Sequence, residues 1–297
     1  MTAKAQTVAL NGAIDADVSQ ATLSGAVSGH ALAAVTLTGS ATDNATDAGT
    51  IAPSAATVKN GETDVTANYD IAYANGVLTV EKGTPEVTAP VAKTLTYNGA
   101  AQELVSAGST TGGTLVYSLT EKGTYGATIP TGTDAGAYEV WYKVNGDDNY
   151  NGVAAQSVSV TIAKKAATVT AKKQTVPLNG AIDADVSQAT LSGAVSGHAL
   201  AAVTLTDSGT NNATNAGTIA PSAATVKNGE TDVTANYDIT YANGVLTVEK
   251  GTPTVTAPVA KTLTYNGAAQ ELVSAGSTTG GTLVYSLTET LCGATSL

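Results

Sequence analysis

The sequence predicts an all-β protein built from tandem β-sandwich modules in an elongated array. Its composition is the first reason. Thr, Ala, Gly, Val and Ser dominate, there are 31 Gly and 12 Tyr, and Arg and Phe are absent. Such a chain has few strong helix formers and many residues suited to strands and turns. A long internal repeat and the period-two alternation of apolar residues are the other two reasons.

The internal repeat covers most of the chain. Residues 2–121 align without gaps on residues 170–289, an offset of 168 residues. The eight differences lie at positions 5, 9, 39, 41, 43, 47, 72 and 86 of the first copy. This period is too long for one solenoid turn, so each repeat unit must contain whole domains. Any site in the first copy therefore has a twin in the second.

Short polar joints divide each repeat unit into two modules. The sequence Gly-Thr-Pro occurs at 83–85 and again at 251–253, where the fixed φ of Pro restricts the joint. The last module has no counterpart of the final strands of the second, so we expect it to be disordered or to pair with a second chain. We interpret the chain as part of a longer array. The four expected modules are 1–83, 84–163, 164–251 and a truncated one at 252–297.

Period-two alternation predicts the strands of the first module type. Tyr69, Ile71 and Tyr73 share one face of an expected strand. The dipeptide Asn75-Gly76 follows and predicts a type I′ hairpin that returns along residues 77–81.

The second module type contains more such stripes, separated by turn clusters rich in Asn, Asp and Gly. About seven short strands in some 80 residues indicate an immunoglobulin-like sandwich, in which Tyr replaces the missing Phe in the core. The stripes are Tyr138, Val140, Tyr142 and Val144; Val158, Val160 and Ile162; and Leu115, Tyr117 and Leu119.

The first module type carries the motifs Leu-Ser-Gly at 191–193, Ala-Gly-Thr-Ile at 216–219, Asn-Tyr-Asp-Ile at 236–239 and Gly-Val-Leu-Thr-Val at 244–248. These resemble the MBG-type repeats of bacterial surface proteins. The second type carries Tyr-Asn-Gly-Ala-Ala-Gln at 97–102, Asp-Ala-Gly-Ala-Tyr at 134–138 and Gly-Asp-Asp-Asn-Tyr at 146–150. It is similar to the Ig-like repeats found beside them. The resemblance, which covers all but the last eight residues, implies an extracellular stalk or adhesin segment at the bacterial cell surface.

Charge and hydropathy exclude several function classes. The net charge is −11 and no Arg is present, which argues against a nucleic-acid partner because phosphate binding needs a basic face. No apolar run approaches 18 residues, so we expect no membrane insertion in this segment. The first residues lack the features of a signal peptide, and the single Cys292 cannot form an intrachain disulfide.

The candidate catalytic residues do not form a recognisable constellation. His30 and His198 are repeat twins without other zinc ligands nearby in sequence, so we interpret them as structural. No Gly-x-Ser-x-Gly motif is present, and Cys292 lies in the divergent tail. Carboxylates spaced two apart would need a cleft to hydrolyse glycosides, and we interpret them as solvated strand-end pairs. These are Asp15 with Asp17 and the twins Asp183 with Asp185. We therefore expect neither an enzyme nor a cofactor.

Three weaker candidates remain. Asp147 and Asp148 lie in an oxygen-rich segment, residues 145–152, that is either a calcium site without EF-hand spacing or an ordinary long turn. Trp141 is either a binding residue for sugar or protein, or it packs over the Lys143 stem or against a neighbouring strand. Lys93 and a late Asn such as Asn149 are candidates for an isopeptide bond, which carries no family signature here.

We therefore predict a non-enzymatic stalk or spacer, with neighbouring repeats of a longer array as partners. Strands and turns give about 35–40 Å per module, so three complete modules in line would span on the order of 110 Å. The alternative is a binding module that recognises a glycan, or a protein of a host or neighbouring cell, through loops or Trp141.

Overall fold

The computed structural model describes residues 1–46, 49–214 and 217–288. The protein is all-β, and the only helices among the described residues are short 3-10 turns. The chain divides into two compact units, Met1–Lys164 and Lys165–Leu297. Among the described residues, no helix has the length and apolarity needed to cross a bilayer.

The most complete sandwich lies in the second unit. A three-stranded sheet has the order β20-β18-β24, and a second sheet has the order β19-β25-β22-β21, with β23 added to β22. The pairs β18–β24 and β19–β25 are parallel. The elements are β18 (Lys165–Ala171), β19 (Gln174–Pro177), η3 (Val186–Gln188), β20 (Ala189–Ser192), β21 (His198–Asp207), β22 (Gly217–Asn228), β23 (Thr231–Asp232), η4 (Thr234–Asn236), β24 (Tyr237–Ala242) and β25 (Gly244–Glu249).

Both sheets of this sandwich contribute to one apolar core. Val169 from β18 and Leu246 from β25 have no exposed surface, and neither has Ile219 from β22. Because successive strand residues point to opposite faces, β25 alternates between buried and exposed along its whole length. The rest of the core cluster is Ala171, Val176, Ala189, Leu205, Ala224 and Val248.

The first unit contains the twin of this sandwich. Its larger sheet has the order β2-β7-β5-β4 with β6 added to β5, and β2 again pairs in parallel with β7. The elements are β1 (Thr2–Ala3), β2 (Gln6–Ala9), η1 (Val18–Gln20), β3 (Ala21–Thr22), β4 (His30–Gly39), β5 (Gly49–Asn60), β6 (Thr63–Asp64), η2 (Thr66–Asn68) and β7 (Gly76–Glu81). The core cluster is Ala3, Leu37, Ile51, Leu78 and Val80.

The hairpin predicted at Asn75-Gly76 is wrong. In the second copy, β24 pairs with β18 in one sheet, whereas β25 pairs with β22 and β19 in the other, so the chain crosses between sheets at this dipeptide. Gly76 does not have the positive φ of a type I′ turn. Glycine is needed for another reason: a Cβ there would lie 2.5 Å from the carbonyl oxygen of Lys4 and 2.7 Å from that of Ala3.

The strand predicted at residues 69–73 forms only in the second copy, as β24. There it pairs in parallel with residues 165–170 of β18. In the first copy, β1 matches only the last two residues of β18 and meets the segment through one bridge, between Thr2 and Ala74. Tyr237 is consequently buried, while its twin Tyr69 is half-buried. Nearly identical sequences thus differ in strand content because their pairing partners differ.

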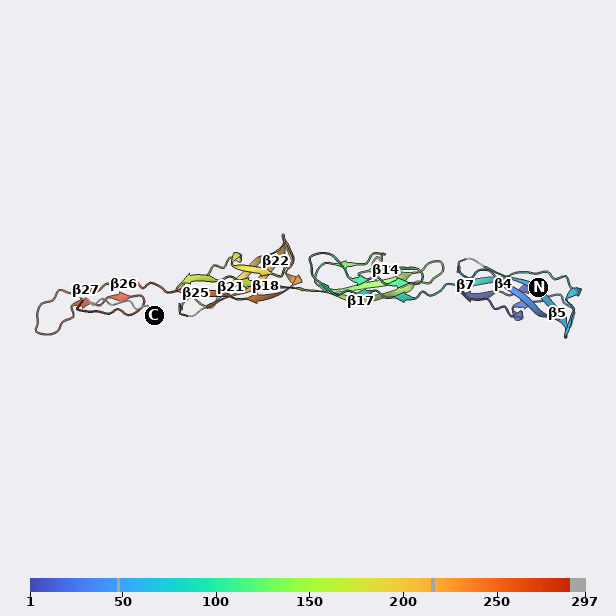
Figure 1. The fold of residues 1–297 in the computed structure, drawn as a ribbon, viewed down its shortest axis with the longest axis horizontal. Helices are drawn as coiled ribbons and strands as arrows, with labels where there is room; N and C mark the ends of the chain where they lie inside the picture. The colour runs from blue at the N-terminus through green and yellow to red at the C-terminus, as the bar shows by residue number, and fades with distance from the viewer. Residues whose placement is uncertain (47–48, 215–216, 289–297) are drawn as a thin grey trace. The chain divides into compact units, whose positions relative to one another are not determined.

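Residues 84–163 form the other sandwich of the first unit, in green in Figure 1. Its main sheet has the order β10-β17-β16-β14, in which β10 and β17 are parallel, and three short pairs, β11–β15, β12–β9 and β13–β8, accompany it. The strands are β8 (Val87–Thr88), β9 (Val91–Ala92), β10 (Leu95–Thr96), β11 (Gln102–Glu103), β12 (Val105–Ser106), β13 (Ser109–Thr110), β14 (Thr114–Ser118), β15 (Thr131–Gly132), β16 (Gly136–Asn145) and β17 (Val153–Ala163).

The alternation predicted for β16 is confirmed: Val140, Tyr142 and Val144 are buried between exposed or half-buried neighbours. The stripe predicted to end at Leu119 is wrong at that residue. β14 ends at Ser118, and Leu119 is 46% exposed in the turn that follows.

In residues 252–288 the structure describes two short antiparallel pairs, β26–β29 and β27–β28. The strands are β26 (Val255–Thr256), β27 (Val259–Ala260), β28 (Val273–Ser274) and β29 (Ser277–Thr278).

Candidate functional site

The turn at residues 145–152, called here the joint turn, is built around the carboxylate of Asp147. The backbone N–H of Gly113 donates to its Oδ2 (2.9 Å). The N–H groups of Asn149 and Tyr150 donate to its Oδ1 (2.9 and 2.7 Å). These bonds, above all the one from Gly113, hold the pKa of Asp147 below its usual range. The carboxylate therefore fixes the turn to the start of β14.

The joint turn also binds the joint, residues 82–85, through its backbone. The N–H of Gly83 donates to the carbonyl oxygen of Asn149, and the N–H of Asn151 donates to that of Gly83, both at 2.8 Å. Gly83 and Tyr150 form a parallel bridge. A two-way backbone pairing of this kind fixes the position of the joint relative to the turn.

Side chains reinforce this contact. Lys82 Nζ donates to the carbonyl oxygen of Asp147 (2.6 Å), and Asn149 Oδ1 accepts a hydrogen bond from the backbone N–H of Ala45 (2.8 Å). The turn thus contacts both the joint and a loop of the preceding sandwich. The turn is predictable from its own residues but these partners are not, because Ala45 lies 104 residues from Asn149.

The ring of Tyr150 packs over glycines of the joint region. A Cβ at Gly83 would lie 3.2 Å from this ring and 3.3 Å from Leu10, and a Cβ at Gly112 would overlap the ring. Glycine at these two positions makes room for the aromatic side chain.

Among the described residues, no three His, Cys, Asp or Glu side chains are grouped so that they could hold a metal ion. The oxygens of Asp147 accept backbone N–H groups, as in an ordinary Asx-type turn. Calcium binding by Asp147 and Asp148 stays a prediction.

The two histidines have equivalent partners in the two copies. His30 Nδ1 lies 2.6 Å from the Tyr69 hydroxyl, and His198 Nδ1 lies 2.6 Å from that of Tyr237. Each hydroxyl also accepts a backbone N–H from the loop before the histidine, for example that of Val195 (3.0 Å). The pair connects a loop to the sandwich. No sequence signal identifies the pair, because the equal separation of 39 residues in the two copies follows from the gapless repeat.

The paired aspartates shape a loop. Asp15 Oδ1 accepts the N–H of Asp17 (3.0 Å), and its Oδ2 accepts Gln20 Nε2 (2.8 Å). Asp17 caps η1 by accepting the N–H of Ser19 (2.8 Å), and hydrogen bonds from Ser19 lower the pKa of Asp17. The second copy repeats this arrangement with Asp183 and Asp185. All four residues are exposed, as expected, but they precede a 3-10 helix rather than end a strand.

Trp141 is half-buried on β16, opposite Ser118 of β14 and Ser157 of β17. The Lys143 ammonium lies 4.5 Å from the centre of the Tyr125 ring. A ligand role of Trp141 stays a prediction.

Lys93 and Asn149 have separate partners. Lys93 Nζ lies 2.7 Å from Glu103 Oε2, whereas Asn149 contacts the preceding sandwich. The structure therefore does not bring them together as an isopeptide bond requires. Cys292 lies outside the described residues.

Comparison with known proteins yields no family. No family model matches the chain, and no curated protein matches it. Among solved structures it is similar to Drosophila N-cadherin EC1-3, with 10% identity, a TM-score of 0.26 and coverage of 84% of this chain and 98% of that chain. It is also similar to protocadherin gammaB7 EC3-6, with 10% identity, a TM-score of 0.24 and coverage of 72% and 62%. At such TM-scores we base no conclusion on the likeness, and the resemblance to MBG-type repeats stays a prediction.

Proposed function

We propose that the chain is a non-enzymatic structural repeat segment, a stalk or spacer, of a bacterial extracellular surface protein or adhesin. The observation that carries this proposal is the joint turn. The carboxylate of Asp147 binds the residue before β14, the amide of Asn149 binds the preceding sandwich, and the ring of Tyr150 packs on the joint. A spacer must hold consecutive domains at a defined distance, and contacts across a joint limit the freedom of a short linker.

The rest of the chain supports this function. Its repeat is nearly identical over 120 residues, which supplies length and multiple copies rather than one unique site. Its acidic, Arg-free composition keeps neighbouring copies soluble and mutually repelling. The histidines and paired aspartates have structural partners.

Small-angle scattering tests the spacer function. We expect the full chain to have a maximum dimension of at least about 110 Å, three modules of strand-and-turn length in line, with calcium and with chelator. The double variant Asn149→Ala, Tyr150→Ala should have a broader distance distribution, because it loses the side-chain contacts to Ala45 and to the glycines of the joint region. Asn98→Ala, which removes a turn contact to Ala100, is the control. A compact particle would contradict the spacer function.

The second candidate function is recognition of a glycan, or of a host or neighbour-cell protein, through loops or Trp141. The half-buried indole between two serines favours it, because an aromatic ring with small neighbours offers a flat contact surface. Glycan and protein arrays probed with the chain and with Trp141→Ala test it. Binding that Trp141→Ala abolishes would replace the spacer as the leading function.

A further inference from the structure

Two stretches of the same sequence have different surroundings in this chain. Residues 252–288 repeat residues 84–120 with a single change, Thr254 for Glu86. The pairs β8–β13 and β9–β12 recur as β26–β29 and β27–β28. In contrast, β10, β11 and β14 pair with β17, β15 and β16, and among residues 252–288 they have no counterpart strand. Only the strands whose partners come from residues 131–163 are missing.

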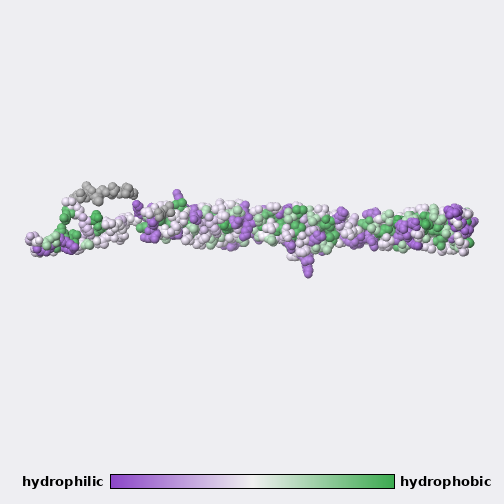
Figure 2. Space-filling model, turned by 90° about the horizontal axis from the view of Figure 1, so that it is seen from below, coloured by the Kyte–Doolittle hydropathy of each residue, from purple (hydrophilic) through white to green (hydrophobic). Residues whose placement is uncertain are grey.

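Four side chains that these later strands help to bury in the first copy are exposed in the second. The exposed fraction rises from 0 to 54% between Leu104 and Leu272, from 3 to 92% between Tyr97 and Tyr265, from 5 to 75% between Val116 and Val284, and from 5 to 54% between Tyr117 and Tyr285. Figure 2 shows hydrophobic residues at the surface of this segment, at the left of the picture. A cavity of about 420 Å³ opens there between Pro258, Leu272, Val284 and Tyr285.

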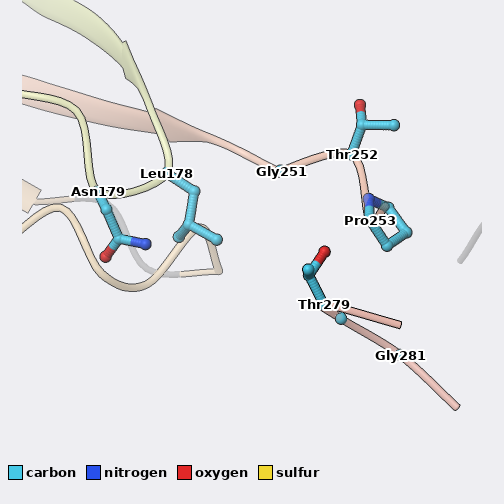
Figure 3. Close-up of a pocket in the computed structure, with 8 residues that line it drawn as sticks. Leu178, Asn179, Gly251, Thr252, Pro253, Thr279 and Gly281 are labelled. Carbon is cyan, nitrogen blue, oxygen red and sulfur yellow. The ribbon is translucent and has the colours of Figure 1, made fainter. Parts of the chain in front are cut away.

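A second cavity, of about 350 Å³, lies at the joint of residues 251–253 (Figure 3). Leu178, Pro253 and Thr279 face it, and Gly251 and Gly280 complete its lining. The twins of Gly251 and Gly280 are the two glycines, at positions 83 and 112, that the Tyr150 ring covers in the first copy. The cavity therefore has the position that a tyrosine of a joint turn would fill.

We propose that residues 252–288 are a docking site for a β-hairpin with the sequence of residues 129–163. Its first strand pairs with residues 282–286 as β16 pairs with β14, and its second strand pairs in parallel with residues 263–264 as β17 pairs with β10. The tyrosine of this hairpin that corresponds to Tyr150 enters the cavity at the joint. Backbone hydrogen bonds along the strand edge and burial of the exposed apolar side chains drive this addition.

Fluorescence anisotropy of a fluorescein-labelled peptide of residues 129–163 tests the proposal with the full chain. We expect saturable one-to-one binding. Val284→Asp should weaken it by about tenfold or more, because a carboxylate would be buried where the twin Val116 is. Val259→Asp is the matched control, since its twin Val91 is 65% exposed beside the hairpin in the first copy. Far-UV circular dichroism and Trp141 fluorescence should be unchanged in both variants.

A peptide with Tyr150→Ala should bind several-fold more weakly, because it leaves the cavity at the joint unfilled. No saturable binding up to about 100 µM peptide would overturn the proposal. Equal binding by the Val284→Asp chain would overturn it too, because the peptide would then occupy another place, such as residues 84–121. A dimer of the chain that forms through residues 252–288 and excludes the peptide would assign the surface to a second copy instead.

Discussion

One leucine of the repeat is buried in the first copy and exposed in the second. Replacing it in each copy therefore tests how much its burial contributes to stability. Leu104 has no exposed surface, whereas Leu272, with the same flanking sequence, is 54% exposed. Truncation of a fully buried Leu to Ala costs about 2–5 kcal/mol through lost burial and the cavity left behind. We therefore expect Leu104→Ala to lower the free energy of unfolding by about 3 kcal/mol. Leu272→Ala should change it by at most about 0.5 kcal/mol, as for a surface position.

Trp141 makes the measurement specific, because it is the single Trp and lies on β16 of the sandwich that contains Leu104. With a denaturant slope of about 1.5 kcal/mol per molar urea, 3 kcal/mol shifts the midpoint of the fluorescence transition by about 2 M. Far-UV circular dichroism follows Leu272→Ala in the other unit. A shift below about 0.5 M for Leu104→Ala, or equal losses for the two variants, would refute the reasoning.

Three further predictions concern the turns and the loops. Gly112→Ala, whose Cβ would overlap the aromatic ring of the joint turn, should cost about 1–3 kcal/mol in the urea transition. Gly280→Ala, with its nearest neighbouring atom 3.7 Å away, should be neutral by circular dichroism, and equal effects would contradict the packing argument. Because the pKa of Asp147 is lowered, its ionised carboxylate stabilises the fold above about pH 4, and this stabilisation is lost as pH falls through the folded pKa. Asp147→Asn should therefore flatten the dependence of the urea midpoint on pH in acid, and an unchanged slope would exclude this contribution. Tyr237→Phe, which removes the hydroxyl shared by a loop N–H and the loop histidine, should cost about 1–3 kcal/mol in thermal unfolding of the second unit. A wild-type melting temperature would show that the loop contact adds nothing.

The fold class followed from composition and alternation, because a strand buried on one face must repeat every two residues. This is why the burial of β16 was predicted from Val140 to Val144. The crossing between sheets at Asn75-Gly76 was not predicted, because the dipeptide is identical whether the two strands pair with each other or lie in different sheets. Only contacts distant in sequence, β18 with β24 and β2 with β7, decide between these arrangements.

The candidate site was predictable only in its local part. Asn, Asp and Gly at 145–152 indicated a turn, and the structure has one. The partners of that turn, Lys82 and Ala45, lie 65 and 104 residues away from it. No periodicity connects such positions. The exposure of Leu272 likewise depends on which strands are present, not on its neighbours in sequence.

The parallel pairing of an early strand with the last strand of each sandwich has a mechanical consequence. In the first sandwich β2 follows the short first strand β1, the chain leaves after β7, and β2 and β7 run in the same direction with four residues of each in register. Tension applied to the two ends would slide them past each other, so their evenly spaced hydrogen bonds share the load and must rupture together. The pair β19–β25 has the same geometry in the second unit. Under tension each such sandwich should keep its length up to a sharply defined rupture force and then unfold in one step.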